Sequence, residues 1–239
     1  MSANGKHIIT LKDRQLINNN IKMWFSRTGS DFSFEPGQYA RITLLEPIHN
    51  DSESNSRLFS IASSPSKDYV MFTTRALDSA FNKNILEMPI GAKAEISDFG
   101  GNTVLHRDSS VPAVFLIGGI GITPVRCMIE YIVSEKLPYK AYLFYSNPTA
   151  ASMAYFEEFE NWAKEFEGFR FIPTIDDTND KNWKYNFGYI TEALIKKYVP
   201  DVLKPVYYIV GPQVMVDAME KLLIGLNVNS DNIKLEKFG

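Results

Sequence analysis

The sequence predicts two domains of different class: an antiparallel β-barrel over residues 1–108, then a doubly wound parallel α/β domain over residues 109–239. In the first half, short β-rich runs are separated by turn residues, which is typical of an antiparallel barrel or sandwich. From about Ser109, apolar strand-like runs alternate with helical patterns, which indicates a parallel sheet with helices on its faces. With 239 residues, 45% of them hydrophobic, the chain can bury a sizeable core.

The first half is expected to contain strands at each β-rich run, bounded by turn formers such as Glu35-Pro36-Gly37. These runs are residues 6–11, 21–26, 38–45, 57–62, 69–75 and 93–96. One helix is expected among them, because Asp78 and Ser79 can cap a segment that ends near Glu87. The polar run 46–56 (EPIHNDSESNS) is interpreted as a solvated loop that could fold over the edge of a ligand.

The second half is expected to alternate strands and helices, with a boundary between the domains near residues 106–111. The predicted strands are residues 113–117, 140–145, 170–173, 206–210 and 233–238. The predicted helices are residues 124–134, 151–166, 191–198 and 214–223. Such an order places parallel strands next to one another with helical crossovers between them.

Composition excludes several classes of function. A net charge of −3 without a run of basic residues argues against a nucleic-acid surface. The single Cys127 excludes an internal disulfide, a zinc–thiolate site and an iron–sulfur cluster, and the His residues lack metal-binding spacing, so no metal site is expected. Since neither a signal peptide nor a long apolar stretch is evident, we expect a cytoplasmic protein without membrane insertion.

The glycine-rich stretch Gly118-Gly119-Ile120-Gly121-Ile122-Thr123-Pro124 follows an apolar strand and opens a predicted helix. Thr123 suits the N-cap of that helix, and Pro124 suits its first position. Glycines and a helix N-terminus together can hold a pyrophosphate. The stretch is not G-x-G-x-x-G, however, and no acidic residue follows at the distance expected for a ribose contact. A tight turn between strand and helix is therefore the alternative.

A second candidate is the run Arg57-Leu58-Phe59-Ser60. On a strand, Arg57 and Phe59 share one face and Ser60 points to the other. The guanidinium could pair with a phosphate, and the aromatic ring could cover a flat ligand. Periodicity alone is equally met by an ordinary barrel strand with a surface arginine. Likewise, Ser79 and Ala80 at a helix start could form a plain cap or a second phosphate site.

Taken in order, these motifs resemble the ferredoxin–NADP reductase superfamily, and especially its bacterial members that lack an iron–sulfur domain. The motifs that carry the resemblance are Phe34–Tyr39 (FEPGQY), Arg57–Ser60 (RLFS), Gly118–Pro124 (GGIGITP), Gly211-Pro212 and Glu236–Phe238 (EKF). Residues 78–101 also resemble the helix and strand that close the family's barrel. The resemblance covers nearly the whole chain.

The resemblance implies an NAD(P)H-dependent flavoprotein reductase, an oxidoreductase whose cofactors are FAD and NADH or NADPH. Arg57 would bind the FAD phosphate, Phe59 would lie against the flavin ring, and Ser60 would act near the flavin nitrogen that accepts hydride. Ser79 and Ala80 would offer amides to the pyrophosphate. Thr123 would lie where flavin and nicotinamide meet, so Ser60 and Thr123 are the implied catalytic residues. The other implied cofactor contacts are Leu58, Thr74, Arg75, Gly118, Gly119, Gly121, Ile122, Pro124, Ser146, Asn147, Gly211, Pro212, Met215 and Phe238.

Two departures from the family pattern are informative. Val210 stands where many relatives have a Cys that abuts the reacting nicotinamide carbon, so hydride transfer could be slower here. The run Ser146–Ala150 has no cation for a 2′-phosphate, which favours NADH over NADPH.

The electron acceptor is expected to be a separate protein, such as a ferredoxin, a flavodoxin or an oxygenase component, or a small oxidant. The alternatives are a free flavin or ferric reductase that uses FAD as a diffusing substrate, and a non-catalytic flavin- or nucleotide-binding subunit of a larger complex.

Overall fold

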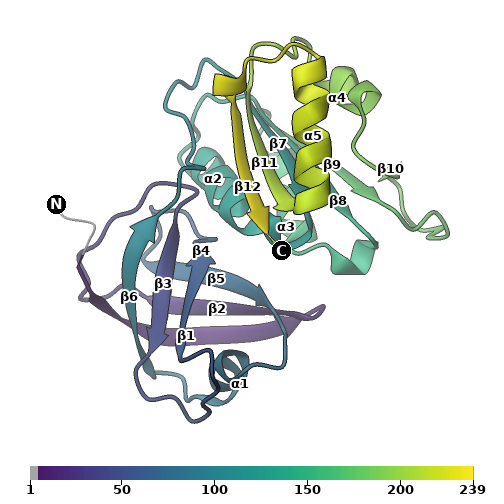
Figure 1. The fold of residues 1–239 in the computed structure, drawn as a ribbon. Coiled ribbons are helices and arrows are strands. Elements are labelled where there is room, and N and C mark those ends of the chain that lie inside the picture. The colour runs from purple at the N-terminus through teal and green to yellow at the C-terminus, as the bar shows by residue number, and fades with distance from the viewer. Residues whose placement is uncertain (1–4, 239) are drawn as a thin grey trace. The chain divides into compact units, whose positions relative to one another are not determined.

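The computed structural model describes residues 5–238, with only the backbone of Phe238. The chain divides into two compact units. The first contains the described residues up to Leu105 together with Thr123–Tyr131, and the second contains His106–Ile122 together with the described residues from Ile132 onward. Figure 1 shows that the first unit is built mainly of β-strands and the second of strands and helices.

The first unit is a barrel-like antiparallel sheet of six strands, in the order β4-β3-β6-β1-β2-β5 (Figure 1). The strands are β1 (His7–Ile17), β2 (Asn20–Ser26), β3 (Tyr39–Leu44), β4 (Ser56–Ser60), β5 (Tyr69–Arg75) and β6 (Lys93–Gly100). Beyond the end of β4, the amide of Ala62 donates to the carbonyl of Met71 on β5 at 2.8 Å. The two outer strands of the sheet are thereby linked, which closes the barrel.

The core of the first unit is filled from the strands, from helix α1 (Ala80–Glu87) and from α2 (Ile122–Ser134). Phe81 and Ile85 of α1 and Cys127 of α2 are at most 1% exposed in this core. Gly37, in the turn before β3, has φ +106°. A methyl group on Gly37 would lie 2.2 Å from the carbonyl oxygen of Thr103, so this turn tolerates only glycine.

The second unit is a six-stranded parallel sheet in the order β10-β9-β8-β7-β11-β12. Its strands are β7 (Ala113–Gly118), β8 (Ala141–Asn147), β9 (Phe169–Ile175), β10 (Asn186–Phe187), β11 (Val206–Pro212) and β12 (Ile233–Phe238). From β7 the chain first builds the sheet toward β10 and then returns to add β11 and β12 on the other side. The order of the strands therefore reverses between β7 and β11, which is where such sheets bind ligands.

Helices cover both faces of the parallel sheet. Ile195 of α4 (Glu192–Tyr198) and Leu223 of α5 (Gln213–Gly225) share a buried cluster with Phe144 of β8. Phe159 of α3 (Phe156–Glu165) instead packs against Tyr145, the next residue of β8, with ring centres 6.3 Å apart. Because successive side chains of a strand point to opposite faces, these helices lie on opposite sides of the sheet. The predicted fold classes are confirmed.

Some predicted boundaries were wrong. β1 continues to Ile17, past a register shift between Leu11 and Asp13. The helix predicted over residues 151–166 begins only at Phe156, because Ala150–Ser152 form a 3-10 turn and Tyr155 adopts the left-handed conformation (φ 62°). The two-residue strand β10 was not predicted, since its only signal is parallel pairing with β9.

Candidate functional site

In the first unit, Arg57 and the N-terminus of α1 form an anion-binding corner. The Arg57 side chain is 21% exposed and lies on β4. Its Nη2 lies 2.8 Å from the carboxylate of Glu53, and its Nη1 donates to the carbonyl oxygens of Glu53 (2.6 Å) and Ser54 (2.9 Å). The guanidinium also lies 5.7 Å from the centre of the Phe81 ring on α1. Strand and helix thus present donors to one place, which we call the anion corner: the Arg57 guanidinium and the Ala80 amide.

The helix start contributes the second donor. Ser79 is the N-cap of α1, since its side chain accepts from the amide of Asn82 at 3.2 Å, as predicted. The Ala80 amide donates to Oδ2 of Asp51 at 2.8 Å, and Oδ1 of Asp51 lies 3.9 Å from Arg57. The Ala80 hydrogen bond, with a smaller contribution from the charge of Arg57, lowers the pKa of Asp51 below its usual value. Carboxylates therefore sit on both donors, which shows that the corner accepts anions such as a phosphate.

Phe59 lies beside the anion corner. Its ring centre is 5.3 Å from that of Phe81 and 6.2 Å from that of Phe72, so Phe59 points to the same side of β4 as Arg57. Leu58 is 49% exposed, and Ser60 is partly exposed. The ring of Phe59 is thus partly engaged with the barrel core.

The end of β5 adjoins the same helix. The carbonyl oxygen of Arg75 accepts from Nδ2 of Asn82 at 2.8 Å, and Arg75 itself is exposed. Thr74 is partly exposed. The structure therefore brings Thr74 and Arg75 close to the first turn of α1, as Arg57 and Phe59 also are.

In the second unit, the glycine-rich loop lies at the carboxyl end of β7, beside β11. A methyl group on Gly118 would lie 2.5 Å from Sδ of Met215, and one on Gly121 would lie 2.7 Å from the carbonyl oxygen of Val210. One on Gly211 would lie 3.1 Å from the amide nitrogen of Gly118. Close packing alone thus accounts for these glycines. The ligand-binding interpretation depends on their position, at the point where the strand order reverses.

The helix after the glycine-rich loop begins earlier than predicted. Gly119–Gly121 form a 3-10 turn, Gly119 has φ +55°, and α2 begins at Ile122. The predicted N-cap at Thr123 and first position at Pro124 are therefore wrong. Both residues lie in the first turn, where the missing N–H of proline leaves no hydrogen bond unmade. Thr123 is 5% exposed.

The neighbouring strand ends complete this edge of the sheet. Ser146 of β8 pairs in register with Gly118, and the hydroxyl of Tyr145 donates to the carbonyl oxygen of Gly119 at 3.1 Å. Asn147 is 3% exposed, and its Nδ2 has no hydrogen-bond partner among the described residues. The backbone of Phe238 pairs with Pro212, whereas the Phe238 side chain lies outside the described part of the structure.

Sequence reasoning missed a buried ion pair on α2. Arg126 and Glu130 have side chains only 6% and 8% exposed, and they lie 3.2 Å apart. Arg126 donates to the carbonyl oxygen of Ala62 at 2.6 Å, and Glu130 accepts from the amide of Ser64 at 2.6 Å. The pair therefore holds the backbone that follows β4. Its i, i+4 spacing was a visible signal, although such pairs are usually solvated.

Sequence reasoning also missed Asp51 and Glu53. Both belong to the polar run 46–56, which was interpreted only as a loop that could fold over a ligand. No periodicity in that run indicates which of its carboxylates reach Arg57.

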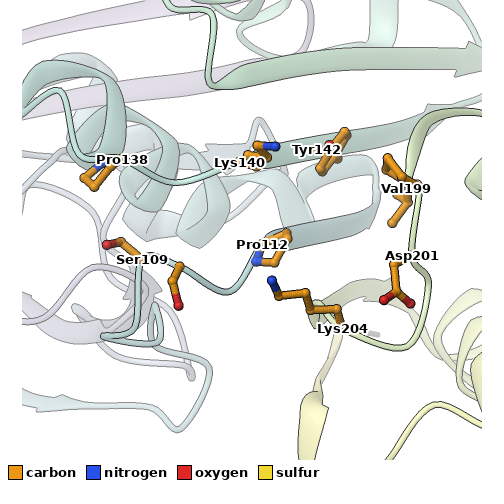
Figure 2. Close-up of a pocket in the computed structure, with 10 residues that line it drawn as sticks. Ser109, Pro112, Pro138, Lys140, Tyr142, Val199, Asp201 and Lys204 are labelled. Atoms are coloured by element: carbon orange, nitrogen blue, oxygen red, sulfur yellow. The ribbon is translucent and has the colours of Figure 1, made fainter.

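A cavity of about 380 Å³ lies at the opposite end of the parallel sheet. Lys140 and Tyr142 at the start of β8, with Asp201 and Lys204 from the segment before β11, are among its lining residues (Figure 2). The cavity contains none of the predicted site residues, so it is separate from the glycine-rich edge.

Comparison with known proteins agrees with this geometry. The family described as "Oxidoreductase NAD-binding domain" matches residues 115–221. A flavohemoprotein of Bacillus cereus is 26% identical over 223 residues, which cover 88% of this chain and 54% of that protein. The flavohem-like FAD/NAD-binding domain of the Vibrio cholerae nitric oxide dioxygenase superposes with a TM-score of 0.81, at 17% identity and over 98% of each chain. The chain is a member of the ferredoxin–NADP reductase superfamily.

This superfamily member also resembles a component of the Na⁺-translocating NADH-quinone reductase of Idiomarina loihiensis, at 27% identity over 85% of the chain and 53% of that component. The chain thus spans about half the length of the curated relatives it matches. Between residues 5 and 238, no helix has the length and apolar character needed to cross a membrane. The same residues contain no cluster of His, Cys, Asp or Glu suited to a metal ion.

Proposed function

We propose that the chain is an NAD(P)H-dependent flavoprotein reductase, with FAD held by the barrel and the nicotinamide nucleotide held by the parallel sheet. The observation that carries the proposal is the glycine-rich edge, where the backbones of β7 and β11 approach closely at the point of strand-order reversal. The bound cofactors supply the chemistry, in which hydride passes from the reduced nicotinamide to the flavin. The protein binds, orients and shields them.

The first unit supplies the flavin contacts. Arg57 and the amide of Ala80 bind the FAD phosphates, because both donors already hold carboxylates. Phe59 lies against the flavin ring from the side of Phe81, and Ser60 offers its hydroxyl near the flavin nitrogen. Leu58, Thr74 and Arg75 border these groups.

The second unit supplies the nucleotide contacts. Gly118, Gly119, Gly121 and Gly211 leave room for the nucleotide at the carboxyl end of the sheet, with Ser146, Asn147, Pro212 and Met215 around them. Ile122, Thr123 and Pro124 continue from this loop into α2, and Phe238 lies at the end of β12.

The preferred donor is NADH. Ser146–Ala150 contain no cation, and the nearest arginine considered from the sequence, Arg126, is bonded to Glu130 and Ala62. A 2′-phosphate therefore lacks the arginine partner that usually recognises it.

The electron acceptor is a separate protein or a small oxidant. The relatives carry names as different as flavohemoprotein and NADH-quinone reductase, so the shared reductase portion serves several acceptors. Which acceptor this chain serves depends on surfaces that the shared motifs do not specify.

Anaerobic reduction tests the proposal. The protein is loaded with FAD and titrated separately with NADH and NADPH while the flavin absorbance is followed. Loss of the oxidised flavin band with NADH, at a lower concentration than with NADPH, is expected. With an artificial acceptor, turnover of about 1–1000 per second is expected for an enzyme of this kind. A flavin that stays oxidised with both nucleotides would overturn the proposal.

One observation favours a second candidate, a reductase that uses FAD as a diffusing substrate. The donors of the anion corner are occupied by the protein's own carboxylates, which weakens the hold on a phosphate. FAD that leaves the protein during gel filtration, while NADH-dependent reduction of added FAD persists, would favour this candidate.

A further inference from the structure

We propose that Asp51 and Glu53 determine the flavin specificity of the anion corner, because a phosphate-bearing flavin must displace their carboxylates before it can bind. The inference rests on the proposed function in one respect, that FAD binds at Arg57 and Ala80. We call Asp51–Glu53 the carboxylate strap.

The strap uses the same N–H groups that a phosphate needs. Nη1 of Arg57 donates to three carbonyl oxygens, those of Glu53 (2.6 Å), Ser54 (2.9 Å) and Ser56 (2.9 Å). Nη2 donates to the Glu53 carboxylate at 2.8 Å. Bidentate recognition of a phosphate by arginine requires two parallel N–H groups. The strap and a phosphate therefore compete for one guanidinium.

The same competition holds at the start of α1. The Ala80 amide lies at the positive end of the helix dipole, where an anion is favoured. Oδ2 of Asp51 accepts from this amide at 2.8 Å. A pyrophosphate that bridged Ala80 and Arg57 would thus have to replace both Asp51 and Glu53.

The chain fixes the strap on both sides, so its position is built into the fold. Upstream, Oδ1 of the fully buried Asn84 on α1 accepts from the amides of Ile48 (2.7 Å) and His49 (2.8 Å). Nδ2 of Asn84 returns a hydrogen bond to the carbonyl oxygen of His49 at 2.8 Å. Downstream, the amide of Leu44 on β3 donates to the carbonyl oxygen of Asn55 at 3.0 Å. The strap thus spans from α1 to β3 over the corner.

The consequence is discrimination by phosphate charge. Riboflavin carries no phosphate and does not compete with the strap, whereas FAD carries a pyrophosphate that does. Like charges close together repel, so each carboxylate that remains near the corner also opposes the phosphates. Removing the two negative charges should therefore tighten FAD binding and leave riboflavin binding nearly unchanged.

The test compares dissociation constants of the full chain for FAD and for riboflavin, measured by quenching of flavin fluorescence. The variant D51N/E53Q keeps hydrogen-bond acceptors and removes both charges. Because exposed ion pairs contribute about 0.2–1 kcal/mol each, its FAD affinity should rise between about twofold and thirtyfold. The control D31N/E46Q removes the same charge from exposed residues of the first unit outside the strap, and should change FAD affinity less.

A second readout follows the strap itself. Cleavage by a glutamate-specific protease at Glu53, whose side chain is 71% exposed, should become faster when FAD is added and stay unchanged with riboflavin. Equal FAD affinity in D51N/E53Q and the wild type would overturn the inference while leaving the proposed function intact. Absence of FAD binding in every variant would overturn both. The single variant E53Q gives the same reading, with a smaller gain, if the double variant is unstable.

Discussion

Replacing Gly121 by alanine should destabilise the protein, because the new methyl group would collide with the backbone of β11. Its carbon would lie 2.7 Å from the carbonyl oxygen of Val210, 2.9 Å from the carbonyl carbon of Val210 and 3.1 Å from the amide nitrogen of Gly211. All three atoms belong to a strand that pairs with β7 on one side and β12 on the other. Such a strand cannot move aside locally, so the glycine-rich loop must shift instead.

The size of the effect follows from two opposing contributions. Overpacking a well-packed site costs about 1–3 kcal/mol, and the reduced backbone freedom of the unfolded chain returns about 0.4–1 kcal/mol. A net loss of about 1–2 kcal/mol of unfolding free energy is expected, which corresponds to roughly 2–8 °C in Tm for a chain of this length. The displaced loop should also weaken NADH binding.

Urea denaturation followed by circular dichroism measures the loss, and quenching of protein fluorescence by NADH measures the affinity. Gly225→Ala is the matched control, because no atom lies within 4 Å of the added methyl group and Gly225 ends helix α5. Its stability should be unchanged or should rise by up to about 1 kcal/mol. If Gly121→Ala were as stable as Gly225→Ala, the packing argument for the loop would be refuted.

Four other outcomes are expected. Arg126→Met should lower the unfolding free energy by about 3–5 kcal/mol in urea denaturation, because it leaves the buried Glu130 carboxylate unpaired; a loss under about 1 kcal/mol would contradict this. Burial lowers the pKa of His106 below 6.5, so the stability gained from its neutral form should be complete above about pH 6.5 and be lost as the pH falls through the lower folded-state pKa; the urea midpoint should drop between about pH 7.5 and 5.5, and less so in His106→Gln. Burial raises the pKa of the Cys127 thiol to about 12, so a thiol reagent should label the protein only when it unfolds; rapid labelling under native conditions would disprove this. Val210→Cys, which restores the residue that the family pattern implies, should speed flavin reduction by NADH by about two- to tenfold in stopped-flow measurements, and an unchanged rate would show that alignment alone sets the step.

The regular elements were predictable because their signals are local. Alternating burial in β2 and β3 reads directly as period-two hydrophobicity, and the fully buried β7 reads as an apolar run. The second part of β1 escaped prediction because residues 12–17 are mostly exposed and show no alternation. It is a strand only because it pairs with β2.

The candidate site divides in the same way. The motifs around Arg57 and Gly118 are short and contiguous, so the sequence could indicate them. The partners of Arg57 could not be indicated, because Asp51 and Glu53 reach it through a loop whose course is set by Asn84 on a later helix. The start of α2 was misplaced for another reason: Thr123 has the residue type of a cap, but the 3-10 turn at Gly119–Gly121 begins the helical path before it.

Helix α2 has a practical consequence for anyone who cuts or recombines this chain. Although it follows a strand of the parallel sheet, its residues Thr123–Tyr131 group with the barrel, where Cys127 fills the core and a methyl group on Gly37 would lie 2.4 Å from Cε of Met128. A barrel fragment that stopped at Leu105 would expose a hole lined by Gly37 and its neighbours. A chimera of two reductases should therefore inherit these turns of α2 from the parent that donates the barrel, even though they are encoded after the first strand of the other parent's sheet.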